Sequence, residues 1–110
     1  MATKIVLRHE EEFRSYLMNK SNNQRVIADC ISRCRRVQKH EGDLAEHFWD
    51  DRGSSLMKRL SYSMEEANKG ISPKHSIEIK GSNGFKSMYE GTHSLHNAVK
   101  QYLDFMKSNR

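Results

Sequence analysis

A run of basic residues at helical spacing is the feature of this sequence best suited to chemistry. The stretch CISRCRRVQKHEGDL, residues 30–44, carries Arg33, Arg35, Arg36 and Lys39. At 100° per residue, Arg36 and Lys39 fall opposite the apolar stripe of such a helix, and Arg33 and Arg35 fall on its two flanks. Guanidinium groups there can fork onto phosphate oxygens while their stems pack against the core edge. The stretch predicts either a phosphate-binding helix or an amphipathic helix with a solvated basic back.

The overall charge points to a polyanionic partner. The chain has a formal net charge of +5 and a sequence pI near 9.4. Such a balance favours nucleic acid as the simplest partner. If the partner is double-stranded DNA, the four basic residues of 30–44 would be its principal phosphate contacts. A second line of contacts comes from two later segments: Lys58, Arg59, Lys80 and Lys86.

The cysteines and histidines do not form the pattern of a metal site. Cys30 and Cys34 stand in register with Ile27 and Ile31, so core packing accounts for both thiols. A structural zinc site usually presents its ligands in pairs on short knuckles. No dinucleotide or phosphate-loop signature occurs either. We expect no metal, no cofactor and no catalytic residue.

One alternative does involve catalysis. Glu78 and Lys80, in IEIKG, resemble half of a metal-dependent restriction nuclease site, in which a carboxylate holds magnesium and a lysine supports the attacking water. The other half would need an aspartate on a neighbouring strand. Asp50 and Asp51 are available, but they fall where the sequence predicts a helix end and a turn. A magnesium nuclease is therefore the third hypothesis.

Repeated capping signals predict an all-helical fold. Ser21 with Gln24 forms one capping box, and Ser63 with Glu66 forms another. Further helix starts are expected at about residues 10, 43, 54 and 92, and Gly42 is a typical helix stop. These signals predict a small orthogonal bundle of four to five helices. We expect a single domain over residues 1–110, standing alone or forming part of a longer parent protein.

The stretch from 71 to about 91 interrupts this pattern. It holds the only proline, Pro73, and three of the six glycines. HSIEIKG alternates enough to make a short strand, but no partner strand is visible. We predict a long loop over about residues 71–91 that could hold one short strand. The closing helix is expected to begin with Thr92 as its cap.

The aromatic residues support a competing hypothesis. Six aromatics are placed as core or core-edge residues: Phe13, Tyr16, Phe48, Trp49, Tyr102 and Phe105. If Phe48, Trp49, Phe85 and Tyr89 were instead exposed, they would form an apolar patch. The basic residues would then pair with acids inside the fold. In that case the chain would be a helical protein–protein interaction or regulatory module.

Two phrases carry a resemblance to a known family. EEFRSYLMNKSNNQRVIADCISRCRRVQKHEG and the later SLHNAVKQYLDFM resemble the amino-terminal core-binding, sterile-alpha-motif-like helical domain of phage integrases and other tyrosine recombinases. The middle, DLAEHFWDDRGSSLMKRLSYS, is similar to helical modules fused to restriction-type nucleases. The resemblance implies DNA binding to the backbone and major groove from one side of the duplex. The chain departs from the family in its turn phrase and in the long loop, and it lacks the recombinase catalytic domain.

The remaining expectations concern location. No apolar run approaches the roughly 18 residues of a membrane span. The amino terminus has only a three-residue apolar patch and no cleavage signal. We expect a cytoplasmic protein with no membrane partner, and a protein partner or a catalytic domain in the parent protein remains open.

Overall fold

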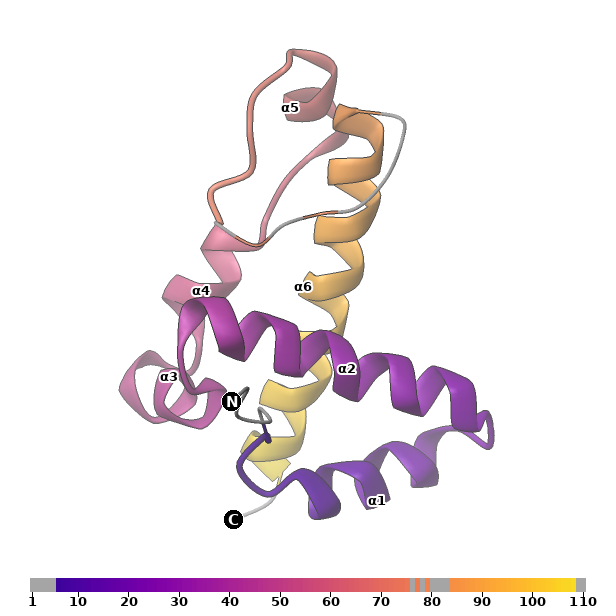
Figure 1. Cartoon of the computed structure of the whole chain (residues 1–110). Helices are drawn as coiled ribbons and strands as arrows, with labels where there is room; N and C mark the ends of the chain where they lie inside the picture. The colour runs from indigo at the N-terminus through magenta and orange to yellow at the C-terminus, as the bar shows by residue number, and fades with distance from the viewer. Residues whose placement is uncertain (1–5, 76, 78, 80–83, 109–110) are drawn as a thin grey trace, which may run out of the picture.

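The computed structural model describes residues 6–75, 77, 79 and 84–108. Helices account for most of this part of the chain and form a bundle (Figure 1). Their bounds are α1 Glu10–Lys20, α2 Gln24–Glu41, α3 Leu44–Asp51, α4 Ser54–Arg59, α5 Met64–Asn68 and α6 Phe85–Ser108. The predicted all-helical class is confirmed.

The helices cross one another steeply around one core. In Figure 1, α1 and α2 run antiparallel and cross the lower half of the long α6, while α3 and α4 lie at one end of α2. The short α5 lies beside the beginning of α6. Phe13 of α1 meets Tyr102 of α6 edge-to-face, with ring centroids 5.1 Å apart. Val37 of α2 and Val99 of α6 are fully buried. The core therefore forms where α1, α2 and α6 meet.

The ends of α2 are fixed by specific groups. The Asn23 side chain accepts hydrogen bonds from the backbone N–H groups of Arg25 and Val26, at 3.0 and 3.2 Å. The predicted cap, Ser21, instead accepts from the N–H of Asn23. The turn before α2 contains several polar side chains that can cap a helix. Asn23, which directly precedes the helix, is the one that accepts hydrogen bonds from the N–H groups of its first turn. Gly42, at φ 95°, ends the helix as predicted.

The long loop is shorter than the sequence predicted. α6 begins at Phe85, seven residues before the expected cap Thr92, which is a buried residue inside the helix. Gly91, predicted to lie in the loop, is inside α6, where a Cβ atom would lie 2.5 Å from Cγ2 of Ile79. The glycine is present to admit the Ile79 side chain and does not break the helix.

The rest of the loop packs against α6 through a histidine. Nε2 of His75 lies 2.8 Å from the Thr92 hydroxyl, and Nδ1 accepts a hydrogen bond from the N–H of Ile77 at 3.1 Å. Among the loop residues that the structure describes, 71–75, 77, 79 and 84, there is no strand. The rest of the stretch predicted as a possible short strand lies outside the described residues.

One of two neighbouring aromatic residues is placed differently from the prediction. Trp49, predicted at the core edge, lies on the surface of α3 with 57% of its area exposed. Phe48, its neighbour in sequence, is buried at 6%. On a helix of eight residues, consecutive side chains point in directions about 100° apart, and only one of the two can face α6.

Candidate nucleic-acid interface

The second half of α2 carries three exposed cations on its outer side. Arg33, Arg36 and Lys39 are exposed, and none has an ion-pair or hydrogen-bond partner among the described residues. Six residues of helix rise about 9 Å, so the three groups span a strip of that length. The face of α2 that carries Ile27 and Ile31 is buried, so these three side chains lie on the solvent side of the helix. The strip can bind anions without breaking any contact inside the fold.

Arg35, the fourth predicted contact, is occupied. Its guanidinium donates to Glu10 of α1 from two nitrogens, with Nε–Oε1 at 2.8 Å and Nη2–Oε2 at 2.5 Å. Glu10 is only 8% exposed and also accepts from the N–H of Leu7. The hydrogen bonds from Arg35 hold the pKa of Glu10 below its ordinary value, against the opposing effect of burial. Arg35 therefore joins α1 to α2.

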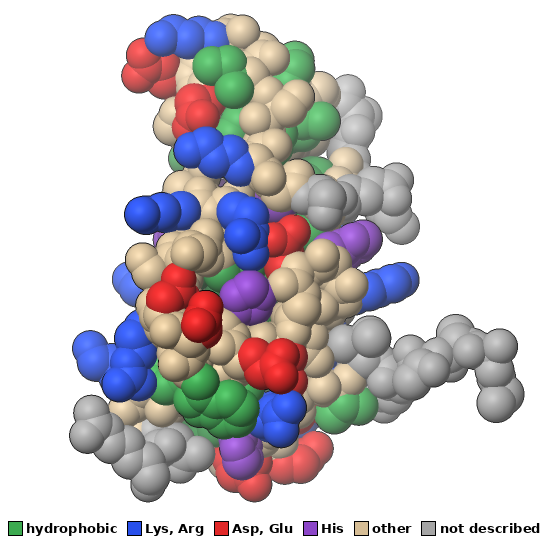
Figure 2. Space-filling view, turned by 90° about the vertical axis from the view of Figure 1, so that its left-hand side faces the viewer, with side chains coloured by type: hydrophobic (Ala, Val, Ile, Leu, Met, Phe, Trp, Pro, Cys, Tyr) green, Lys and Arg blue, Asp and Glu red, His purple; other side chains and the backbone are tan. Residues whose placement is uncertain are grey.

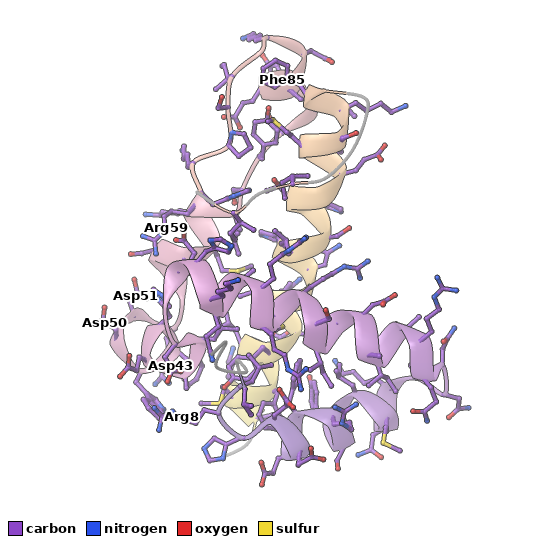
Figure 3. The ribbon with its side chains drawn as sticks, viewed as in Figure 1. Arg8, Asp43, Asp50, Asp51, Arg59 and Phe85 are labelled. Atoms are coloured by element: carbon purple, nitrogen blue, oxygen red, sulfur yellow. The ribbon has the colours of Figure 1, made fainter. Side chains whose placement is uncertain are left out.

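Arg59, a predicted second-line contact, is also paired. Its Nε atom lies 2.5 Å from Oε1 of Glu41, at the end of α2 (Figure 3). The Glu41 side chain is 9% exposed, so this ion pair is largely withdrawn from water on the acidic side. Its neighbour Lys58 is exposed and has no ion-pair partner within the described chain. The pair ties α4 to α2.

The other second-line residues are not gathered beside α2. Lys86 is exposed in the first turn of α6, near Phe85, which Figure 3 labels at the end of the molecule away from α2. Lys80 lies outside the described residues. Figure 2 shows basic and acidic side chains interspersed on the face that it presents. A continuous positive strip in the described chain is therefore best supported on α2.

A groove of about 350 Å³ runs along one flank of that strip. It lies between the end of α1, the first half of α2 and α6, with Lys20 and Arg33 among its lining residues. The Nζ atom of Lys20 lies 3.5 Å from Oε1 of Gln101 and 4.7 Å from the centre of the Tyr16 ring. Further polar groups come from three residues: Ser21, Ser94 and Asn97. The groove extends the strip with hydrogen-bonding groups.

The two cysteines are packed beneath this groove as core residues. The thiols of Cys30 and Cys34 both face the backbone oxygen of Ala98 in α6, with sulfur–oxygen distances of 3.9 and 3.2 Å. Both thiols are free, and burial raises the pKa of Cys34 well above its ordinary value. In the part of the chain that the structure describes, no group of three or more His, Cys, Asp or Glu residues is arranged to hold a metal ion.

The residues of the nuclease hypothesis are only partly described. Glu78 and Lys80 lie outside the described residues. The Asp51 carboxylate already caps α4, accepting from the N–H groups of Gly53 and Ser55 at 3.1 and 3.0 Å and from the Ser55 hydroxyl at 2.6 Å. These hydrogen bonds hold the pKa of Asp51 below its ordinary value. Asp50 is exposed beside it (Figure 3).

The sequence did not predict the acids that form ion pairs with Arg35 and Arg59. Glu10 and Arg35 are 25 residues apart, and Glu41 and Arg59 are 18 apart. Helical spacing reports only on neighbours within about one turn, so it carries no signal for such pairs. The one available signal was that both acids sit at helix ends.

Comparisons with known proteins add no assignment: no family model, curated protein or solved structure matches this chain. Within the described ranges, none of the helices has the length and apolar character needed to cross a membrane.

Proposed function

We propose that this chain is a non-catalytic domain that binds duplex DNA through the phosphate backbone, using the exposed strip on α2. One observation carries the proposal: Arg33, Arg36 and Lys39 are exposed and form no ion pair with the residues that the structure describes, whereas Arg35 and Arg59 are held by nearly buried acids. Cations left without partners on a rigid helix are available for phosphates at no cost to the fold. The resemblance to the core-binding domain of integrases supports the same ligand.

The proposal narrows the predicted set of contacts. Arg33, Arg36 and Lys39 bind phosphates directly, and Lys20 continues the strip across the groove. Six residues of α2 rise about 9 Å, which corresponds to two or three phosphates at about 3.4 Å of duplex axis per strand. Arg35 and Arg59 act by fixing the position of α2 against α1 and α4.

The test is a titration of fluorescently labelled duplex DNA with the purified chain, read by anisotropy. The variant Arg33→Gln/Arg36→Gln removes two strip charges. Its matched control is Lys74→Gln/Lys107→Gln, which removes two exposed charges, one from the loop after α5 and one from the end of α6. We expect the strip variant to weaken binding by tenfold or more and the control to weaken it much less.

Two results would reject the proposal. Absence of binding at low salt would show that the strip is a solvated helix back. Equal weakening by the strip variant and the control would show that only net charge matters and that α2 has no special part.

A further inference from the structure

The chain's only tryptophan lies on a surface that the DNA proposal does not use. Trp49 is 57% exposed on α3, and a groove of about 550 Å³ runs beside it. Figure 2 looks onto the side of the molecule where α3 lies and shows apolar side chains between acidic and basic ones in its lower half. Tryptophan is enriched among the residues that contribute most to binding at protein interfaces.

The Trp49 ring already binds one guanidinium. The Arg8 group lies 5.3 Å from the ring centroid and is held there by Asp43, with Nη2–Oδ2 at 2.8 Å and Nε–Oδ2 at 3.3 Å. Figure 3 shows Arg8 and Asp43 close together beside α3. The surroundings of the ring thus combine a π-face with a carboxylate, which is the arrangement that arginine prefers.

Two carboxylates that line the groove have no cation within ion-pair distance among the described residues. The groove is lined by Glu46 and Asp50, which lie one turn apart on α3, are exposed, and form no ion pair within the described chain. The other acids that line it, Glu41 and Asp43, are neutralised by Arg59 and Arg8. In a chain of net charge +5, this groove is locally acidic. Its charge is complementary to a basic ligand and opposed to a phosphate.

We propose that the groove beside Trp49 binds an arginine side chain in a basic segment of a partner protein. The guanidinium stacks on Trp49 and donates to the carboxylates of Glu46 and Asp50, repeating the contacts that Arg8 makes with the ring and Asp43. Arginine fits better than lysine because its planar group can stack and donate two parallel hydrogen bonds at once.

The experiment uses the intact chain and a synthetic peptide of alternating arginine and glycine, capped at both ends. Trp49 fluorescence follows binding directly, because no other tryptophan contributes. The matched ligand is the same peptide with citrulline in place of arginine, which keeps the shape and removes the charge. For variants, a labelled peptide is followed by anisotropy, so that Trp49→Leu can be measured as well.

We expect a saturable change in Trp49 emission with the arginine peptide and binding at least tenfold weaker with the citrulline peptide. Trp49→Leu and Glu46→Gln/Asp50→Asn should each weaken arginine-peptide binding by about tenfold. The control Glu90→Gln/Asp104→Asn removes two exposed carboxylates from α6 and should change it by less than about twofold. Duplex DNA binding should not weaken in any of the three variants, because phosphates do not occupy this groove.

Three outcomes would overturn the proposal. Equal binding of the two peptides would show that no guanidinium is recognised. Equal losses in the α3 and α6 acid variants would show a general charge effect. Self-association of the chain at binding concentrations, abolished by Glu46→Gln/Asp50→Asn in sedimentation, would show that a second copy occupies the groove.

Discussion

Arg35 and Arg36 are adjacent in sequence, yet the structure gives them opposite roles. Arg35→Gln should destabilise the fold, because it leaves the Glu10 carboxylate, 8% exposed, with only the N–H of Leu7 as a partner. The substitution removes two charge-assisted hydrogen bonds from a site that water only partly reaches. Together these are worth about 2 kcal/mol. Arg36→Gln removes no contact inside the fold and should stay within about 0.5 kcal/mol.

The assay is urea unfolding, monitored by circular dichroism. It is applied to both single variants and to the double variant Glu10→Gln/Arg35→Gln. If the same variants are unfolded by heat, a loss of about 2 kcal/mol should lower the melting temperature of a domain of this size by about 8 °C. The double variant should recover part of the loss, since it leaves no unpaired charge. DNA affinity should show the reverse order, with Arg36→Gln weakening binding more than Arg35→Gln.

The pH dependence gives an independent check on the same pair. Because the folded pKa of Glu10 is lowered, its contribution to stability is fully present above the unfolded pKa, about 4.3, and is lost as pH falls through the folded value. The stability difference between wild type and Arg35→Gln should therefore shrink in strong acid. Equal stability of Arg35→Gln and Arg36→Gln at neutral pH, or a difference unchanged in strong acid, would refute this reasoning.

Three further predictions concern the packing of α6. Burial lowers the pKa of His75 in the folded state, so the unfolded chain takes up the proton more readily. The stability of the fold should therefore decrease as pH falls below the unfolded pKa of about 6.5. His75→Gln should reduce this decrease, measured by urea unfolding at several pH values. Gly91→Ala should cost about 1–2 kcal/mol in urea unfolding, because the new Cβ meets Ile79, and adding Ile79→Ala should make the two losses less than additive. Tyr102→Phe should cost about 1 kcal/mol in the same assay, because the buried hydroxyl donates to the Arg8 backbone oxygen at 2.7 Å; a neutral result would show that this hydrogen bond contributes nothing net.

The helices and several of their ends could be predicted because local signals determine them. The Ser63–Glu66 capping box forms as predicted, Asp43 caps α3, and Gly42 ends α2. The start of α6 could not be predicted, because Gly91 is required by a contact with Ile79, twelve residues earlier, and not by a turn. A glycine that makes room for a side chain looks the same in sequence as one that breaks a helix.

The candidate site was predictable only in outline. The periodicity of α2 places Arg36 and Lys39 opposite the apolar stripe and the other two arginines on its flanks. All four are exposed except Arg35, which is half-buried. The pattern could not predict that Arg35 faces Glu10 and that Arg33 lines a groove. The residues beside each of them come from helices that are distant in sequence. The exposure of Trp49 could not be predicted for a related reason. Phe48 and Trp49 are both large and apolar, and the orientation of α3 determines which of the two is buried.

The salt dependence of DNA binding tests the central claim most directly. We assume that Arg33, Arg36 and Lys39 each neutralise one phosphate. The slope of log K against log salt concentration should then be about −2.7 or steeper for the wild-type chain. It should flatten by about 1.8 in Arg33→Gln/Arg36→Gln and hardly change in Arg35→Gln. A slope near zero, or one that flattens as much in Arg35→Gln as in Arg36→Gln, would contradict the assignment of the α2 strip to phosphates.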